Sequence, residues 1–92
     1  MNLLEVMIVT ECEIALTRSD TPLDTENPDQ FCASFAALEV AAGITLRSAC
    51  GFGPTASAAL EQLAAAISRR IVVKDAGDSS RRREWQLPAV TV

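Results

Sequence analysis

The stretch that decides the fold runs from Phe31 to Arg70 and reads FCASFAALEV-AAG-ITLRSACGFGPT-ASAALEQLAAAISRR. Its first half contains two segments in which apolar residues recur in period two, the pattern of half-buried strands. Its second half is rich in alanine and leucine, which favour helix most strongly. The stretch therefore predicts a small α+β domain: an antiparallel sheet of three to four strands with one principal helix packed on one face.

The segment Ala41-Ala42-Gly43 predicts a hairpin, because glycine accepts the positive φ that closes a three-residue turn. This loop pairs Val40 with Ile44 and Leu38 with Leu46, so that the apolar residues of both strands fall on one face. In the second strand, the residues that we expect on this inner face are Ile44, Leu46, Ser48, Cys50 and Phe52.

The turn before the predicted helix contains Gly51, Gly53 and Pro54, which end the strand, and Thr55, a suitable N-cap. Leu60, Leu63 and Ile67 then recur at helical spacing and predict the face that meets the sheet. A turn of this kind can also direct backbone N–H groups at an anion or a sugar. Because it lacks both the third glycine of a dinucleotide fingerprint and the Gly-Lys of a P-loop, we expect a structural turn.

The flanking segments predict further strands around this unit. Apolar residues at even positions from Leu4 to Leu16 predict one long half-buried strand, followed by a polar loop over residues 18–30 whose carboxylates lack the spacing of a calcium loop. Ile71-Val72-Val73 and the segment from Arg81 to Leu87 are candidates for short additional strands. We expect residues 1–92 to form a single domain, with residues 75–92 as a peripheral strand and tail.

Composition excludes several classes of protein. No segment approaches the roughly 20 apolar residues of a membrane span, and the N-terminus carries Glu5 with no basic residue, unlike a secretory signal. Cys12, Cys32 and Cys50 have no paired spacing, so we expect small buried thiols in a reducing cytoplasm. The chain contains no histidine, which argues against zinc, and we expect no metal or other cofactor.

Catalysis also lacks support in the sequence. The chain has neither histidine nor tyrosine, and no base accompanies Ser48, Ser57 or Cys50, so we expect a non-catalytic protein. Its net charge of −4 is unevenly distributed. Residues 1–40 hold eight acidic residues and one basic residue, a net of −7, whereas residues 41–92 hold four acidic and seven basic residues, a net of +3. Such asymmetry suits association between subunits.

The sequence offers two candidate binding surfaces. Met7, Val9 and Phe35 point away from the predicted helix side of the sheet, and such apolar residues suit burial against a protein partner, most simply a second copy in a two-fold homodimer. An exposed strand edge is a second form of the same hypothesis. The alternative is nucleic-acid binding by Arg81, Arg82, Arg83 and Trp85, since arginines neutralise phosphates and an indole stacks on bases.

The run from Phe31 to Val73, with its hairpin, Gly51-x-Gly53-x-Thr55 turn, Ala/Leu helix and apolar exit, resembles small proteins encoded by phages and prophages. It is also similar to the hairpin-plus-helix unit of HicB-type antitoxins and of double-stranded-RNA-binding domains. The resemblance implies a hairpin packed against a helix, and a phage-derived assembly or binding module.

Overall fold

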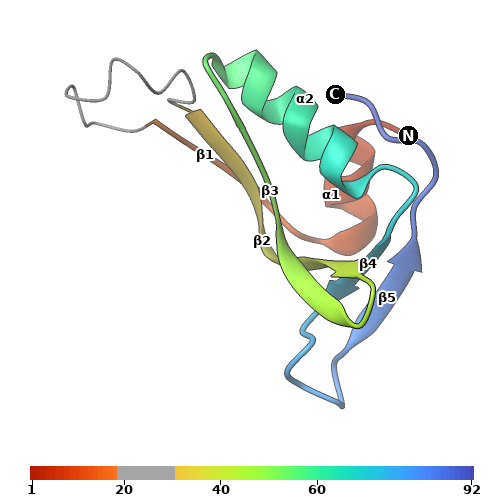
Figure 1. Cartoon of the computed structure of the whole chain (residues 1–92). Coiled ribbons are helices and arrows are strands. Elements are labelled where there is room, and N and C mark those ends of the chain that lie inside the picture. Colours follow the sequence, from red (N-terminus) through yellow and green to blue (C-terminus); the bar gives the residue numbers. More distant parts are fainter. Residues whose placement is uncertain (19–30) are drawn as a thin grey trace.

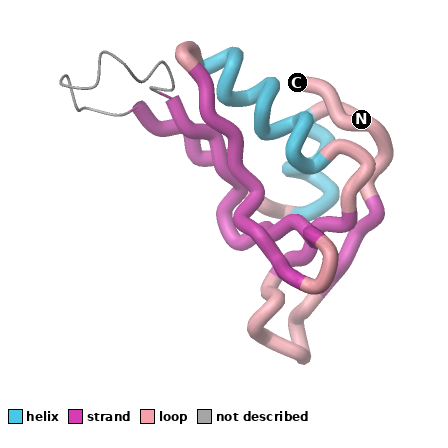
Figure 2. The backbone as a smooth tube through the Cα atoms, in the orientation of Figure 1, coloured by secondary structure: helices cyan, strands magenta, loops and turns pink. Residues whose placement is uncertain are grey.

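The computed structural model describes residues 1–18 and 31–92. The elements follow in the order α1 (Leu3–Thr10), β1 (Ile14–Arg18), β2 (Phe31–Ala42), β3 (Thr45–Gly53), α2 (Ala56–Ile67), β4 (Ile71–Lys74) and β5 (Arg83–Gln86). Within these residues the five strands form one antiparallel sheet, and both helices contribute to the same core (Figures 1 and 2). The predicted α+β class is confirmed, with five strands in place of three or four and a second helix beside the principal one.

Strand β2 is the centre of the sheet, because both of its edges are paired. One edge pairs with β3, while the other pairs with β1 along its first half and with β4 along its second, and β5 then pairs with β4. Between these halves, residues 35–38 stand opposite the single residue Ala49, and Ala37 has a φ of 59°. This bulge changes which residues of the strand point inward, from odd-numbered to even-numbered, so that Phe35 and Leu38 at its two ends are both buried.

The predicted hairpin register is correct in only half of the hairpin. Next to the turn, Val40 lies opposite Arg47 rather than Ile44, because the loop has two residues, Gly43 and Ile44. Gly43 has a φ of 65°, and a glycine at the first central position is what a two-residue turn of this kind requires. Beyond the bulge, Ser34 stands opposite Cys50, which is the predicted offset.

Helix α2 packs so closely on β3 that only the smallest side chains fit between them. Thr55 caps the helix as predicted, its Oγ1 accepting a hydrogen bond from the Ala58 backbone N–H at 3.0 Å. A Cβ atom built on Gly51 would lie 2.2 Å from the backbone nitrogen of Leu63. The inner face of β3 is consequently Ala49, Gly51 and Gly53, all buried, and the prediction that Ile44, Leu46, Ser48, Cys50 and Phe52 form it is wrong.

The predicted strand over residues 4–16 is also wrong, because its first half is helix α1. A capping box starts this helix: the Asn2 side chain accepts from the Glu5 N–H at 2.8 Å, and the Glu5 carboxylate accepts from the Asn2 N–H at 3.2 Å. Leu3, Val6 and Thr10 are buried at helical spacing. Only Ile14–Arg18 forms a strand, so the alternating pattern covered two different elements.

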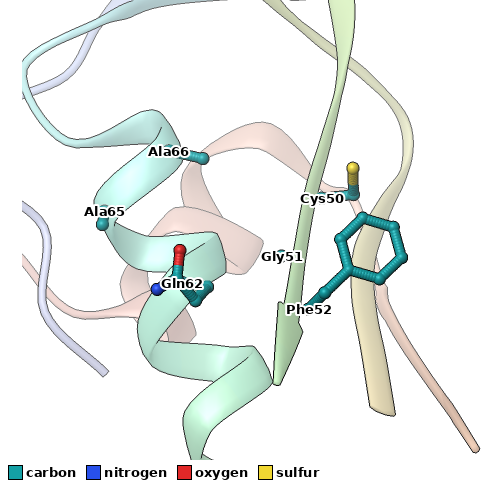
Figure 3. Close-up of a pocket in the computed structure, with 6 residues that line it drawn as sticks. All are labelled: Cys50, Gly51, Phe52, Gln62, Ala65 and Ala66. Carbon is teal, nitrogen blue, oxygen red and sulfur yellow. The ribbon is translucent and has the colours of Figure 1, made fainter. Parts of the chain in front are cut away.

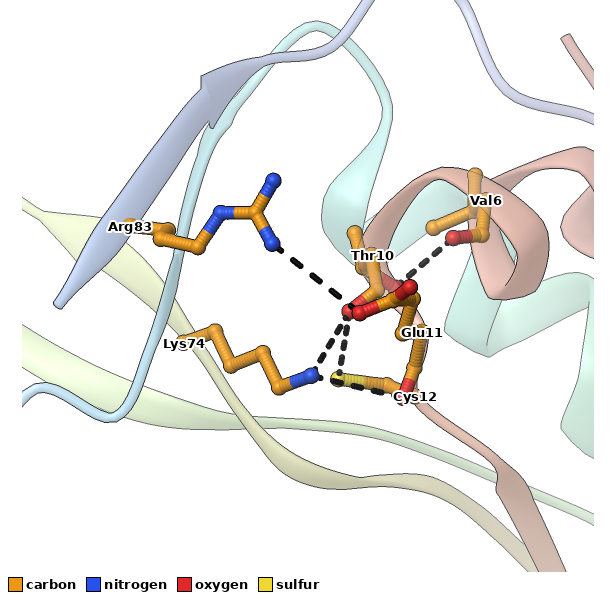
Figure 4. A network of polar contacts seen from close by, with 6 residues as sticks. All are labelled: Val6, Thr10, Glu11, Cys12, Lys74 and Arg83. Atoms are coloured by element: carbon orange, nitrogen blue, oxygen red, sulfur yellow. Dashed lines mark hydrogen bonds and ion pairs between the residues drawn. The ribbon is translucent and has the colours of Figure 1, made fainter. Parts of the chain in front are cut away.

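Contacts with β4 and β5 hold the C-terminal end of α1 (Figure 4). Lys74 Nζ donates to the carbonyl oxygens of Thr10 and Glu11, at 3.0 and 3.4 Å, and the Arg83 guanidinium lies 4.0 Å from the Glu11 carboxylate. Two cations at the end of a helix suit its dipole, and the Lys74 ammonium also partners its free carbonyl groups.

The C-terminal residues are part of the core rather than a peripheral tail. Leu87 and Val90 are buried, and Thr91 exchanges backbone hydrogen bonds with Met1 and Leu3 at 2.9 Å. The two chain ends therefore lie side by side next to α1 (Figure 1). Trp85 is half-buried and packs against the same core.

Candidate protein-binding surface

The structure does not form the sheet face expected from Met7, Val9 and Phe35. Met7 and Val9 lie on α1 rather than on a strand; Met7 packs against the core, and Val9 is 41% exposed. Phe35 is only 5% exposed, because the β2 bulge turns it inward. The three residues therefore do not make one partner surface, and only Val9 is free to meet a partner.

The arginine-rich segment is present as a cluster, but its charges are already partnered. Arg82 lies 2.8 Å from Glu84, and Arg81 lies 3.9 Å from Asp78. Hydrogen bonds from Ser80 lower the pKa of Asp78, so this carboxylate stays ionised and keeps its negative charge beside Arg81. The guanidinium of Arg83 stands 5.1 Å from the centre of the Trp85 ring, as well as facing Glu11.

This arrangement is poorly suited to nucleic acid. Each of the three arginines has a carboxylate within 4.0 Å, which lowers the positive potential that attracts phosphates. One face of the Trp85 ring is also covered by Arg83, so that face cannot stack on a base. Arg83 instead links β5 to the end of α1 through Glu11.

The outer edge of β3 is the most prominent open feature of the sheet. Within the described residues, β3 pairs only with β2, which leaves one edge of a nine-residue strand without a partner. The other open edges belong to shorter strands, β1 with five residues and β5 with four. Unpaired N–H and C=O groups along such an edge are a template for another strand.

A groove runs between this edge and α2 (Figure 3). It has a volume of about 520 Å³ and is lined by residues 50–52 of β3 and by Gln62, Ala65 and Ala66 of α2. A second hollow of about 300 Å³ continues it toward the hairpin turn, where Arg47 and Arg70 line it together with Ala66. No carboxylate is among the residues that line either hollow, so the groove is neutral at one end and basic at the other.

Neither the open edge nor the groove was predicted in this form. The groove wall on α2 is built from alanines, and alanine also forms the buried side of this helix at Ala59 and Ala64, so the sequence offers no contrast between the two sides. The signal that was available is the pair Gly51 and Gly53. Two glycines at alternate positions of a strand indicate that another backbone approaches closely, which places α2 beside β3.

Among the described residues, no three metal-binding side chains come together. The acidic residues of the 19–30 segment lie outside the described residues. Neither helix of the described chain is long and apolar enough to cross a membrane. Comparison of the chain with family models, curated proteins and solved structures gives no significant match.

Proposed function

We propose that this chain is a non-catalytic protein-binding module, and that two copies associate through the open edge of β3 to form a homodimer. The observation that carries the proposal is the nine-residue edge of β3 with no partner among the described residues. Addition of a strand to such an edge satisfies its backbone hydrogen-bonding groups and is a recurrent mode of protein recognition.

A two-fold dimer through β3 has physical support on both sides of the strand. Antiparallel pairing of β3 with its copy uses the same surface on both chains, as an isologous interface requires, and would extend one sheet through both. The flank of α2 beside the edge carries only Gln62, Ala65 and Ala66, so the helix of a second copy could approach closely. Phe52, which is 51% exposed, would add apolar burial next to the edge.

The remaining features fit an assembly role. The chain has no histidine or tyrosine to act in acid–base chemistry. Its three cysteines are free, which suits the reducing environment of the cytoplasm. The resemblance of residues 31–73 to phage-encoded hairpin-plus-helix proteins is consistent with a small assembly or binding module of phage origin.

Sedimentation equilibrium of three variants tests the proposal. Ala66→Glu places a carboxylate in the groove wall beside the β3 edge, and we expect it to convert a dimer into the 9.8 kDa monomer. Ser57→Glu, an exposed change on the same helix outside the groove, is the matched control and should remain dimeric.

A third variant addresses the rival apolar surface on α1. Ile8 is 71% exposed there, and Ile8→Glu should leave the dimer intact if the β3 edge is the interface. A wild-type chain that sediments as a monomer at every concentration would overturn the homodimer. A dimer that Ile8→Glu dissociates and Ala66→Glu does not would move the interface to α1.

A further inference from the structure

Two of the three cysteines lie together on the open face of the sheet, which sequence analysis did not foresee. Cys32 stands opposite Phe52 and Cys50 stands opposite Ser34, so the two cysteines are diagonal neighbours on adjacent strands. Cys50 is two residues from Phe52, the partner of Cys32, and side chains two residues apart on a strand point to the same face. The two cysteine side chains therefore share one face. Figure 3 shows Cys50 and Phe52 on the side of β3 that faces away from α2.

The two thiols lie in a partly buried environment. Burial, and then the charge of Cys50, raise the pKa of the Cys32 thiol. Both cysteines are free and half-buried. The third cysteine is separate from this pair: Cys12 is buried near the end of α1, where its Sγ donates to the Thr10 carbonyl oxygen at 3.5 Å.

Small polar and apolar side chains surround most of the pair, with one carboxylate beside it. The register places Thr17 opposite Cys32, Ala15 opposite Ser34 and Glu39 opposite Ser48, so the described side chains that border the pair on this face are Ala15, Thr17, Ser34, Ser48 and Phe52, with Glu39 diagonal to Cys50. No basic group among them would stabilise a thiolate for disulfide exchange.

We propose that Cys32 and Cys50 form a two-coordinate site for a soft monovalent cation of the Cu(I) type. Thiolate sulfur is the ligand class that selects Cu(I), and a site with only two such ligands does not satisfy tetrahedral Zn²⁺. Among the described residues, no third metal-binding side chain joins the pair. Among the described residues of this face the two sulfurs are the only soft donors, since Glu39 offers a hard carboxylate oxygen.

The diagonal spacing favours a bridging ion over a disulfide. Diagonal neighbours on paired strands are about 7–8 Å apart at Cα, which is at or beyond the limit for a disulfide. Metal–sulfur bonds of about 2.3 Å let two sulfurs stand up to about 4.6 Å apart, compared with about 2.05 Å in a disulfide. Binding follows Cu(I) + 2 RSH → [RS–Cu–SR]⁻ + 2 H⁺, with no change of oxidation state.

Anaerobic titration of the whole chain with Cu(I), in competition with the chromogenic chelator bicinchoninate, tests this site. We expect one Cu(I) per chain, with thiolate-to-copper charge-transfer absorption in the near ultraviolet. Loss of an outer-shell contact to a metal site costs 10–100-fold in affinity, so loss of a ligand in Cys32→Ser or Cys50→Ser should cost at least about 100-fold. Both positions are half-buried, and circular dichroism verifies that each variant is folded.

Cys12→Ala is the matched control, since it removes a thiol outside the pair and should bind Cu(I) within about two-fold of the wild type. Double replacement of Cys32 and Cys50 by serine should abolish the charge-transfer band. The proposal is overturned if the wild type cannot compete with bicinchoninate, if Cys32→Ser binds as tightly as the wild type, or if half a Cu(I) binds per chain, which would indicate a bridge between two chains.

Discussion

Replacement of Gly51 by alanine is the sharpest test of how α2 meets the sheet. The added Cβ would lie 2.2 Å from the Leu63 nitrogen, 2.6 Å from the Ala59 carbonyl oxygen and 2.7 Å from the Gln62 carbonyl carbon, all of them backbone atoms. Ordinary van der Waals contact begins at 3.4 Å, so α2 must retreat from β3 by roughly 3.4 − 2.2 = 1.2 Å. No side-chain rotation relieves these contacts.

The cost follows from the packing that this retreat opens. A gap of 0.5–1 Å forfeits a quarter to a half of each dispersion contact, and the buried face of α2 includes Leu63 and Ile67. Overpacking usually costs 1–3 kcal/mol, and because rigid backbone is displaced here we expect about 3 kcal/mol or more. A domain of ordinary stability, about 5–15 kcal/mol, would lose a large part of it.

Urea unfolding followed by circular dichroism and by Trp85 fluorescence measures this loss. Gly77→Ala is the matched control, because nothing lies within 4 Å of its added Cβ, and we expect a change within about 0.5 kcal/mol. If Gly51→Ala unfolds at the same urea concentration as the wild type, then α2 does not lie against β3 as described.

Three further predictions concern other parts of the molecule. Lys74→Met removes the ammonium that caps α1 and should lower the free energy of unfolding by about 1–2 kcal/mol. Arg81→Met is the control and should be nearly neutral, so equal effects of the two changes in urea unfolding would contradict the capping role. In a variant with Cys12 and Cys50 replaced by serine, iodoacetamide should alkylate Cys32 with a higher pH midpoint in the folded chain than in the urea-unfolded chain. The reason is that burial is the main cause of the raised pKa of Cys32, and equal midpoints would contradict it. Fluorescence anisotropy at about 50 mM salt should detect no binding to single- or double-stranded RNA or DNA. The nucleic-acid alternative would be restored by binding that disappears both at high salt and when Arg81, Arg82 and Arg83 are all changed to alanine.

Local signals in the sequence were sufficient for α2 and for the existence of the central hairpin, but not for the register next to its turn. Thr55, Leu63 and Ile67 act as predicted, because capping and helical spacing depend on neighbours within a few residues. The N-terminal strand failed because its apolar residues satisfy both a period of two and a period of 3.6. The Asn2–Glu5 capping box decides between these periods, and Leu4 and Ile8, which looked like inward strand residues, are exposed on α1.

The candidate surface could not be predicted from alternation alone. Large apolar residues were expected on the inner face of β3, but α2 lies so close that a Cβ atom at Gly51 or Gly53 would clash with it. Phe52 is on the opposite, exposed face. The bulge at Ala37 changes which residues of β2 point inward, and Phe35 lies in the core as a result. No residue type in this alanine-rich segment indicates a bulge. An open strand edge is a property of the assembled sheet, so it emerges only once every pairing is known.

Hydrogen–deuterium exchange at two protein concentrations tests the central claim most directly. If β3 pairs with its copy, the backbone amides of residues 45–53 should become more protected as the concentration rises through the dimerisation range, while those of β5, which also has an open edge, should not change. Exchange across β3 that is the same at low and high concentration, or concentration-dependent protection confined to α1 or β5, would contradict the account.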